Sequence, residues 1–159
     1  MIATVVRRTI ALATTAACLG ACSAARCSAS PPPSTVRFAG SGGAATLRVD
    51  VARTPASWAL GLMRQRFLPA NQGELFQFDG LSNAPFWMKD TRIPLSIAFY
   101  GVGRRIVDLQ DMQPCLQDPC PLYRSARPFV GAIEANQGYF LGHGIGVGDR
   151  VRVRIPVCS

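Results

Sequence analysis

Short runs in which apolar and polar residues alternate are the feature that most constrains this chain. In Thr46–Ala52, Leu47, Val49 and Val51 fall on one side of an extended backbone and polar residues on the other, as in a half-buried strand. Similar runs, separated by turn-forming residues, lie at Glu74–Phe78, Leu95–Tyr100, Arg105–Met112, Phe129–Glu134 and Arg150–Val157. Six or seven short strands predict a mainly β fold, a compact antiparallel β-sandwich or barrel.

One helix is expected beside these strands. Thr54 can accept a hydrogen bond at a helix N-terminus, and Pro55 suits the first helical position. Trp58, Leu62 and Met63 then share one helical face. We expect this helix to cover one opening of the sandwich or barrel.

The first 22 residues have the composition of an export signal. Arg7 and Arg8 precede a mostly apolar region, Thr9–Leu19, that is much shorter than the ~20 residues needed to cross a bilayer. Small residues before Cys22 resemble a bacterial lipobox, with ordinary signal-peptidase cleavage as the alternative. The sequence therefore predicts an exported lipoprotein of the cell membrane or outer membrane, lipidated at Cys22, with Sec and twin-arginine export both open.

A segment rich in serine, alanine and proline follows at residues 23–44. Such a composition cannot build a core, and the prolines at 31–33 favour extended polyproline II. We expect a signal at 1–22, a tether at 23–44 and one β-rich domain at 45–159.

The chain is basic, with a formal net charge of +8, and loss of the two arginines of the signal leaves +6. A basic surface favours anionic partners, although a solvated arginine face explains the same composition. Because export separates the protein from cellular nucleic acid, we expect no nucleic-acid partner. A monomer is the expected state.

The stretch Phe86–Leu95 combines aromatic, charged and turn-forming residues and supports two interpretations. In one, Phe86, Met88 and Ile93 belong to the core and Lys89 lies with Asp90 in a solvated turn. In the other, a shallow groove binds an anionic or sugar-like ligand, because an aromatic ring beside cations suits such ligands. The groove would be lined by Trp87, Lys89, Thr91 and Arg92.

The same stretch carries a family resemblance. Phe86-Trp87-Met88-Lys89, Ile93-Pro94-Leu95, Gly73-x-Leu75-Phe76-x-Phe78, Gly61-Leu62-Met63 and Gly146-Val147-Gly148-Asp149 resemble the bacterial and archaeal family called domain of unknown function 192, DUF-192 or UPF0127. The resemblance extends from Leu47 to Val157. It implies a compact β-rich fold, frequent export and no established activity. Three positions depart from the family pattern, which usually has methionine, asparagine and aspartate at Glu74, Asp90 and Ser96.

A hydrolase acting on cell-envelope polymers is the alternative class of function. It would depend on His143, the only histidine, or on Glu74 and Glu134, the only glutamates. No nucleophile-elbow pattern surrounds a serine, and paired glutamates would have to lie ~5–10 Å apart. We expect Glu134 to pair with an arginine instead. One histidine with Cys-x4-Cys makes a poor zinc site, so no metal or cofactor is expected.

The cysteines outside the predicted signal predict one local disulfide. With Cys22 lipidated, Cys27, Cys115, Cys120 and Cys158 remain. The turn-forming residues between Cys115 and Cys120 let the loop fold back to disulfide distance. Pairing of Cys27 with Cys158 is left open. Together these features favour an envelope-tethered, noncatalytic binding or accessory domain.

Overall fold

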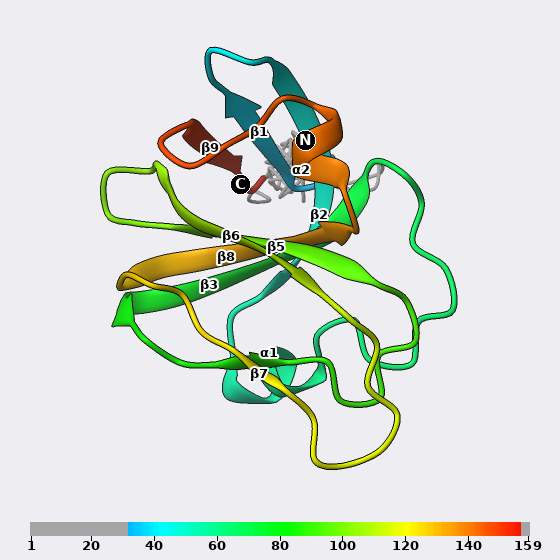
Figure 1. The fold of residues 1–159 in the computed structure, drawn as a ribbon. Helices are drawn as coiled ribbons and strands as arrows, with labels where there is room; N and C mark the ends of the chain where they lie inside the picture. The colour runs from blue at the N-terminus through cyan, green and yellow to red at the C-terminus, as the bar shows by residue number, and fades with distance from the viewer. Residues whose placement is uncertain (1–31, 157–159) are drawn as a thin grey trace, which may run out of the picture.

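The computed structural model describes residues 32–156, which form two sheets and two short helices (Figure 1). The large sheet contains seven strands: β1 (Thr35–Ala39), β2 (Ala44–Ala52), β3 (Gln72–Ser82), β5 (Leu95–Tyr100), β6 (Ile106–Met112), β8 (Phe129–Asn136) and β9 (Arg150–Arg154). The small sheet contains β4 (Phe86–Trp87) and β7 (Leu122–Tyr123), and the helices are α1 (Pro55–Leu60) and α2 (Tyr139–Gly142). The mainly β class is confirmed.

The large sheet is mixed, with the strand order β6-β5-β8-β3-β2-β1-β9. Each neighbouring pair is antiparallel except β2 and β3, which are parallel. The parallel pair arises because α1 and the loop after it carry the chain from the end of β2 back to the start of β3. Alternation in the sequence predicts β2 and β3 as separate strands but not the parallel pairing between them.

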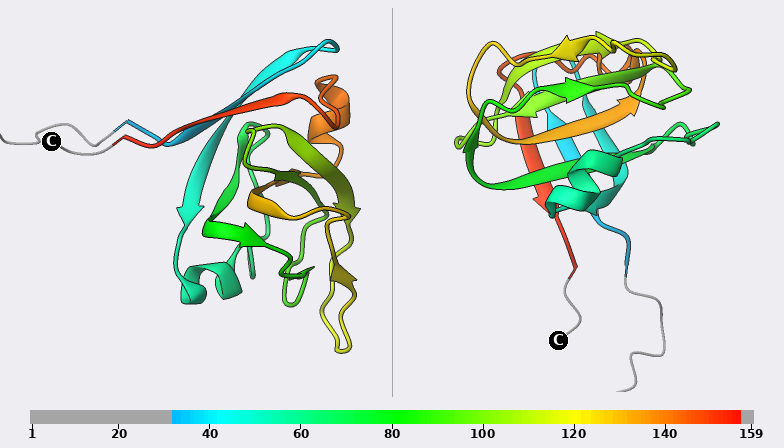
Figure 2. Two further views of the ribbon diagram at one scale, coloured as in Figure 1. Left: turned by 90° about the vertical axis from the view of Figure 1, so that its left-hand side faces the viewer. Right: turned by 90° about the horizontal axis from the view of Figure 1, so that it is seen from below.

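The sheet curls until its two edge strands meet at one end, which makes a half-barrel (Figure 2). The Ile106 amide at the start of β6 donates a hydrogen bond to the Asp149 carbonyl at 2.9 Å. The Val151 amide of β9 donates to the Arg104 carbonyl at 2.8 Å. These bonds cover edge groups that would otherwise be open to pairing with another chain.

Strand β1 corrects the predicted start of the domain. It lies within residues 23–44, where composition predicted only a tether, yet it pairs with both β2 and β9. Val36 and Phe38 alternate with polar or small residues and are fully buried. Five residues were too short a run to distinguish from the preceding segment, so the folded part begins about ten residues before residue 45.

Two clusters of buried side chains pack on the two faces of the sheet. One contains Leu47 and Leu75 of the sheet with Tyr139 and Phe140 of α2. The other contains Phe76, Phe99 and Phe129, together with Phe86 and Met88 from the chain that covers this face. Within residues 32–156, no helix has the length and apolar character needed to span a membrane.

Candidate functional site: an aromatic pocket above two glutamates

Helix α1 forms one wall of the site because its start is firmly capped. The Ser57 amide donates to the Thr54 hydroxyl oxygen, and the Thr54 amide donates to the Ser57 hydroxyl oxygen, at 3.2 and 2.9 Å. The helix ends at Leu60 because Gly61 takes a φ of +44°, so the predicted extension to Met63 is a turn instead. That turn still brings Met63 to the same wall.

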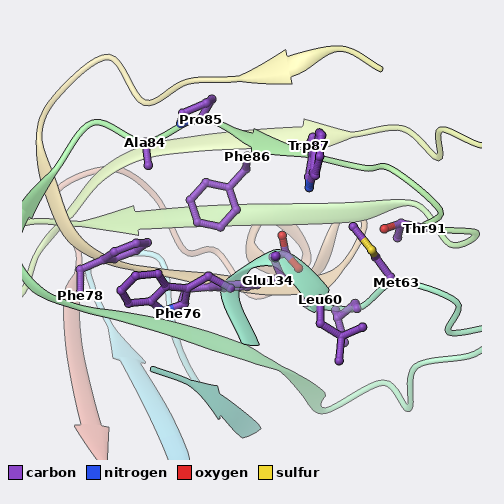
Figure 3. Close-up of a pocket in the computed structure, with 14 residues that line it drawn as sticks. Leu60, Met63, Phe76, Phe78, Ala84, Pro85, Phe86, Trp87, Thr91 and Glu134 are labelled. Carbon is purple, nitrogen blue, oxygen red and sulfur yellow. The ribbon is translucent and has the colours of Figure 1, made fainter. Parts of the chain in front are cut away.

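A pocket of about 260 Å³ opens between α1, β3 and β4 (Figure 3). Most of its lining is aromatic or aliphatic, and we call it the aromatic pocket. Its main apolar side chains are Trp58, Leu60, Met63, Phe76, Phe78, Phe86 and Trp87. Thr91 and the carboxyl group of Glu134 are polar groups in the lining. This is the usual make-up of a small-molecule site, at a volume just below the common range of about 300–1,000 Å³.

The two tryptophans of the chain both line this pocket, but one is held by contacts and the other is exposed at the mouth. Trp58 donates its indole N–H to the Ala52 carbonyl at 3.1 Å, and its ring lies 4.8 Å from that of Phe78. Trp87 is 45% exposed and lies at the mouth. The pocket therefore has one fixed aromatic wall and one accessible ring.

Below the rings, three acidic residues stand in a row across neighbouring strands. Strand register pairs Asp50 of β2 with Glu74 of β3, and Glu74 with Glu134 of β8. Register partners share a face, and the Cβ atoms of an antiparallel pair such as Glu74 and Glu134 are about 4.5–5.5 Å apart. Asp50 is exposed, whereas Glu74 and Glu134 are 8% and 4% exposed. Glu74 and Glu134, which we call the acid pair, thus form a buried pair of carboxyl groups.

Burial and mutual repulsion favour the protonated forms of the acid pair. Desolvation, followed by the charge of Glu74, raises the pKa of Glu134 to about 8. Desolvation, followed by the charge of Asp50, raises the pKa of Glu74 to about 7. Near neutral pH the two carboxyls therefore hold between one and two protons.

The prediction that Glu134 pairs with an arginine is wrong. An arginine was expected, because partly buried acids usually have one, but the register neighbours of Glu134 are Glu74 on one side and Ile97 on the other. Within residues 32–156, no ion pair joins Glu134 to an arginine. Alternation in each strand could have placed the glutamates on one face with Phe76 and Phe78, but the pairing of β3 with β8 is not encoded in either strand alone.

The predicted groove residues divide between two places. Trp87 and Thr91 line the aromatic pocket. Arg92 lines a separate cleft of about 380 Å³ with Arg64, Arg66, Asp90 and Leu116, which we call the arginine cleft. The Arg64 amide donates to the Asp90 carbonyl at 2.9 Å, and this bond joins the two segments that separate the sites. The core interpretation is confirmed for Phe86 and Met88, which are buried.

Lys89 lines neither site. Its Nζ lies 2.6 Å from Asp118 Oδ2, and this hydrogen bond is the main reason that its pKa is raised. The ammonium also lies 5.9 Å from the centre of the Trp87 ring, beside the pocket mouth. The partner carboxylate leaves Lys89 poorly placed to serve as a free cation for a ligand.

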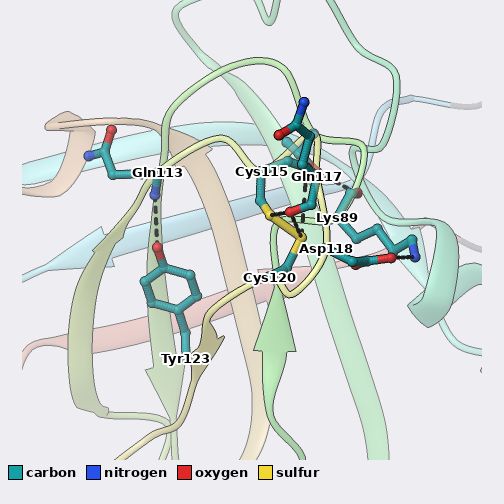
Figure 4. The surroundings of a disulfide bond; sticks show 8 residues. Lys89, Gln113, Cys115, Gln117, Asp118, Cys120 and Tyr123 are labelled. Carbon is teal, nitrogen blue, oxygen red and sulfur yellow. Dashed lines mark hydrogen bonds and ion pairs between the residues drawn. A yellow bond between two sulfur atoms is a disulfide. The ribbon is translucent and has the colours of Figure 1, made fainter.

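A closed loop supplies that carboxylate (Figure 4). Cys115 and Cys120 lie at disulfide distance with their Cα atoms 5.8 Å apart, which agrees with the predicted pairing. Cys115 also bridges to Lys89 and Thr91 in the backbone, so the loop lies against the central stretch. Leu116, from the same loop, reaches the arginine cleft. The predictions for Cys22, Cys27 and Cys158 concern residues outside the described part of the chain.

His143 is not part of the aromatic pocket. It follows α2, and its Nδ1 lies 2.7 Å from the Tyr139 carbonyl oxygen. Since Tyr139 packs in the cluster on the opposite face of the sheet from Phe76, the histidine and the acid pair are not brought together. Within residues 32–156, no group of three or more His, Cys, Asp or Glu side chains is arranged to hold a metal ion.

Fold and site together define a small β domain with a preformed apolar pocket, and a family model covers most of it. The model of the DUF192 family, described as "Uncharacterized ACR, COG1430", matches residues 36–153, and the chain belongs to this family. The match begins eleven residues earlier than the resemblance inferred from sequence, because it includes β1.

Two crystal structures resemble the fold. A protein of unknown function from Novosphingobium aromaticivorans is 33% identical, with a TM-score of 0.69 over 74% of this chain and 83% of that one. A protein from Sinorhizobium meliloti, described as a "putative transcription regulator", is 27% identical, with a TM-score of 0.70 over 79% of this chain and 96% of that one. No curated protein matches the chain.

Proposed function

We propose that this protein is a noncatalytic binding domain that holds a small ligand by a ring or another flat apolar face in the aromatic pocket. The observation that carries the proposal is the preformed lining, in which Trp58 is held by its hydrogen bond and Trp87 remains accessible. An aromatic wall of this kind suits the apolar face of a sugar as well as an aromatic ring.

The anionic ligand expected from the sequence has support at a different place. Arg64, Arg66 and Arg92 line the arginine cleft with one acid, Asp90. Guanidinium groups bind carboxylates and phosphates through paired hydrogen bonds. We assign an anionic group of a ligand, or a separate anionic ligand, to this cleft rather than to the pocket, whose described lining contains no basic side chain.

One observation supports the hydrolase alternative, and two oppose it. The acid pair lies on neighbouring strands, as a pair of catalytic carboxyls would require. However, Glu74 does not line the pocket, so only Glu134 would reach a bound substrate. His143, the other candidate base, is on the opposite face of the sheet. The geometry therefore favours binding over catalysis.

The cellular setting is also part of the proposal and rests on the sequence. A lipid on Cys22 would hold the domain at the outer face of a bacterial membrane through the residues before β1. Mass spectrometry of the native N-terminus should find acyl groups on Cys22, and an unmodified N-terminus further along the chain would contradict the anchor. The monomeric state and the absence of a nucleic-acid partner stay predictions.

Intrinsic fluorescence tests the binding proposal directly, because both tryptophans of the chain line the pocket. A panel of ring compounds and cell-wall sugars is titrated into the full chain, and melting temperatures are measured in parallel. At least one compound should shift both the emission and the melting temperature, and Trp87→Ala should weaken its binding. Leu141→Ala, at an exposed position on α2, is the control. Equal binding by wild type and Trp87→Ala would reject the pocket as the site.

A further inference from the structure

Glu134 is a buried residue whose carboxyl group has no partner in the described part of the chain. It is 4% exposed, and within residues 32–156 no hydrogen bond or ion pair involves it or Glu74. Figure 3 shows its carboxyl group in the middle of the lining, between the wall that carries Trp87 and the wall that carries Leu60. Buried carboxyls are costly without a partner, so this position destabilises the fold unless something else occupies the space above it.

The described groups around this carboxyl are acidic or apolar, so any charge that forms there is negative. Glu74 faces it from β3, with Asp50 beyond on β2, and β5 contributes the apolar Ile97. Lys89 stands outside the mouth and is paired with Asp118. Among the described side chains that line the pocket, none is basic. The space above Glu134 is therefore suited to a cation and unsuited to an anion.

We propose that Glu134, supported by Glu74, binds the cationic nitrogen of an amine whose ring or apolar body fills the aromatic pocket. This inference rests on the proposed function and names the ligand class. The ammonium would donate hydrogen bonds to the Glu134 carboxylate, and the Thr91 hydroxyl oxygen lines the same space as a second acceptor. The rings of Trp87 and Phe86 attract a cation further through their π faces.

Binding of an amine also has a proton signature. A cation next to the acid pair favours its ionised form, so it lowers the pKa values of carboxyls that are partly protonated near neutral pH. Entry of an ammonium ion should therefore release a proton to solvent at pH 7, whereas a neutral alcohol of the same shape should not. This readout distinguishes charge recognition from simple filling of an apolar space.

The test uses benzylamine, benzyl alcohol and benzoate, which share one ring and differ in charge. Each is titrated into the full chain at pH 7 by calorimetry in two buffers of different ionisation enthalpy, with tryptophan emission as a second readout. Wild type should bind benzylamine about tenfold more tightly than benzyl alcohol, release protons with the amine alone and bind benzoate weakest. Glu134→Gln, which keeps the shape of the side chain, should bind both neutral and cationic probes equally without proton release. Asp79→Asn, at an exposed position of β3 outside the row of acids, is the matched control.

The possible results separate this inference from the proposed function. Equal binding of amine and alcohol by wild type, or a preference for amine that survives in Glu134→Gln, overturns the cation site and leaves the pocket as a binding site. Binding of none of the three ring compounds, with no change in tryptophan emission, rejects the proposed pocket for such ligands and the cation site with it.

Discussion

The aromatic pocket and the arginine cleft are neighbours, separated by segments that the hydrogen bond from the Arg64 amide to the Asp90 carbonyl joins. They differ in how they are built. The pocket is made of core side chains whose rings pack on one another and on the sheet, with a buried acid pair below. The cleft is made of exposed arginines in loops and turns. Arg64 and Asp90, which both line it, have positive φ. The aromatic pocket is therefore part of the hydrophobic core, whereas the arginine cleft is a feature of the surface.

This difference predicts how closely binding and stability are coupled. In the pocket, a buried residue that shapes the ligand space also fills the core, so its removal lowers both ligand affinity and the stability of the fold. In the cleft, an arginine side chain contributes charge without burial, so binding can be lost while the fold is kept. The following substitutions test that contrast.

Phe86→Ala should have the largest effect. Phe86 is 9% exposed, and its ring centre lies 5.0 Å from that of Phe76 and 5.5 Å from that of Phe99. Loss of a buried phenylalanine costs about 3–5 kcal/mol through lost burial and the cavity left behind. Urea unfolding should show this loss, and ring compounds should no longer bind. Phe67→Ala, at a side chain that is 73% exposed, is the control and should change stability little.

The acid pair should make stability fall with rising pH. In the unfolded chain both glutamates have the ordinary pKa of 4.5, whereas in the folded protein the values are about 7 and about 8. Between these limits the folded state binds more protons, so stability is full below pH 4.5, falls as pH rises and levels off above about pH 8. Each pH unit by which a folded pKa exceeds the unfolded one contributes about 1.4 kcal/mol, so the loss should be several kcal/mol.

Comparison with Glu134→Gln isolates this contribution from those of other groups. The variant lacks the buried charge, so its free energy of unfolding at pH 9 should exceed that of wild type, and its decline from pH 5 to pH 9 should be shallower. Urea unfolding at both pH values measures the difference. Parallel pH profiles for the two proteins would contradict an acid pair that is buried in the folded state.

These two sites also show which structural features could be predicted from the sequence. Alternation predicted the strands around Leu47 and Ile97, and the spacing of turn formers predicted the closeness of Cys115 and Cys120, because both depend on residues near in sequence. The acid pair depends on the register between β3 and β8, whose paired glutamates are sixty residues apart. No local pattern determines such a pairing. The split of the predicted groove has the same origin, because the turn at Asp90 directs Thr91 and Arg92 to different sites.

The disulfide loop should contribute an intermediate amount of stability and affect the arginine cleft more than the aromatic pocket. Closing the short loop between Cys115 and Cys120 is expected to stabilise the fold by about 2 kcal/mol, less than a long loop would. The double variant Cys115→Ser/Cys120→Ser should lose that amount in urea unfolding. Because Leu116 reaches the arginine cleft, anion binding there should weaken as well, whereas the fixed Trp58 wall of the pocket should keep its emission. A free thiol at either position in protein purified without reductant would contradict the pairing.

Arg92→Ala should have the smallest effect on stability and a selective effect on binding. The side chain is exposed, so the free energy of unfolding should change by no more than about 0.5 kcal/mol. Phosphate or a carboxylate polymer should bind the variant more weakly than wild type, and the difference should shrink as salt screens the remaining arginines. Lys89→Ala is the matched control: it also removes one positive charge, but from a residue already paired with Asp118, so it should change anion binding less. If Lys89→Ala weakens anion binding as much as Arg92→Ala does, net charge rather than the cleft determines binding, and the contrast between the two sites fails.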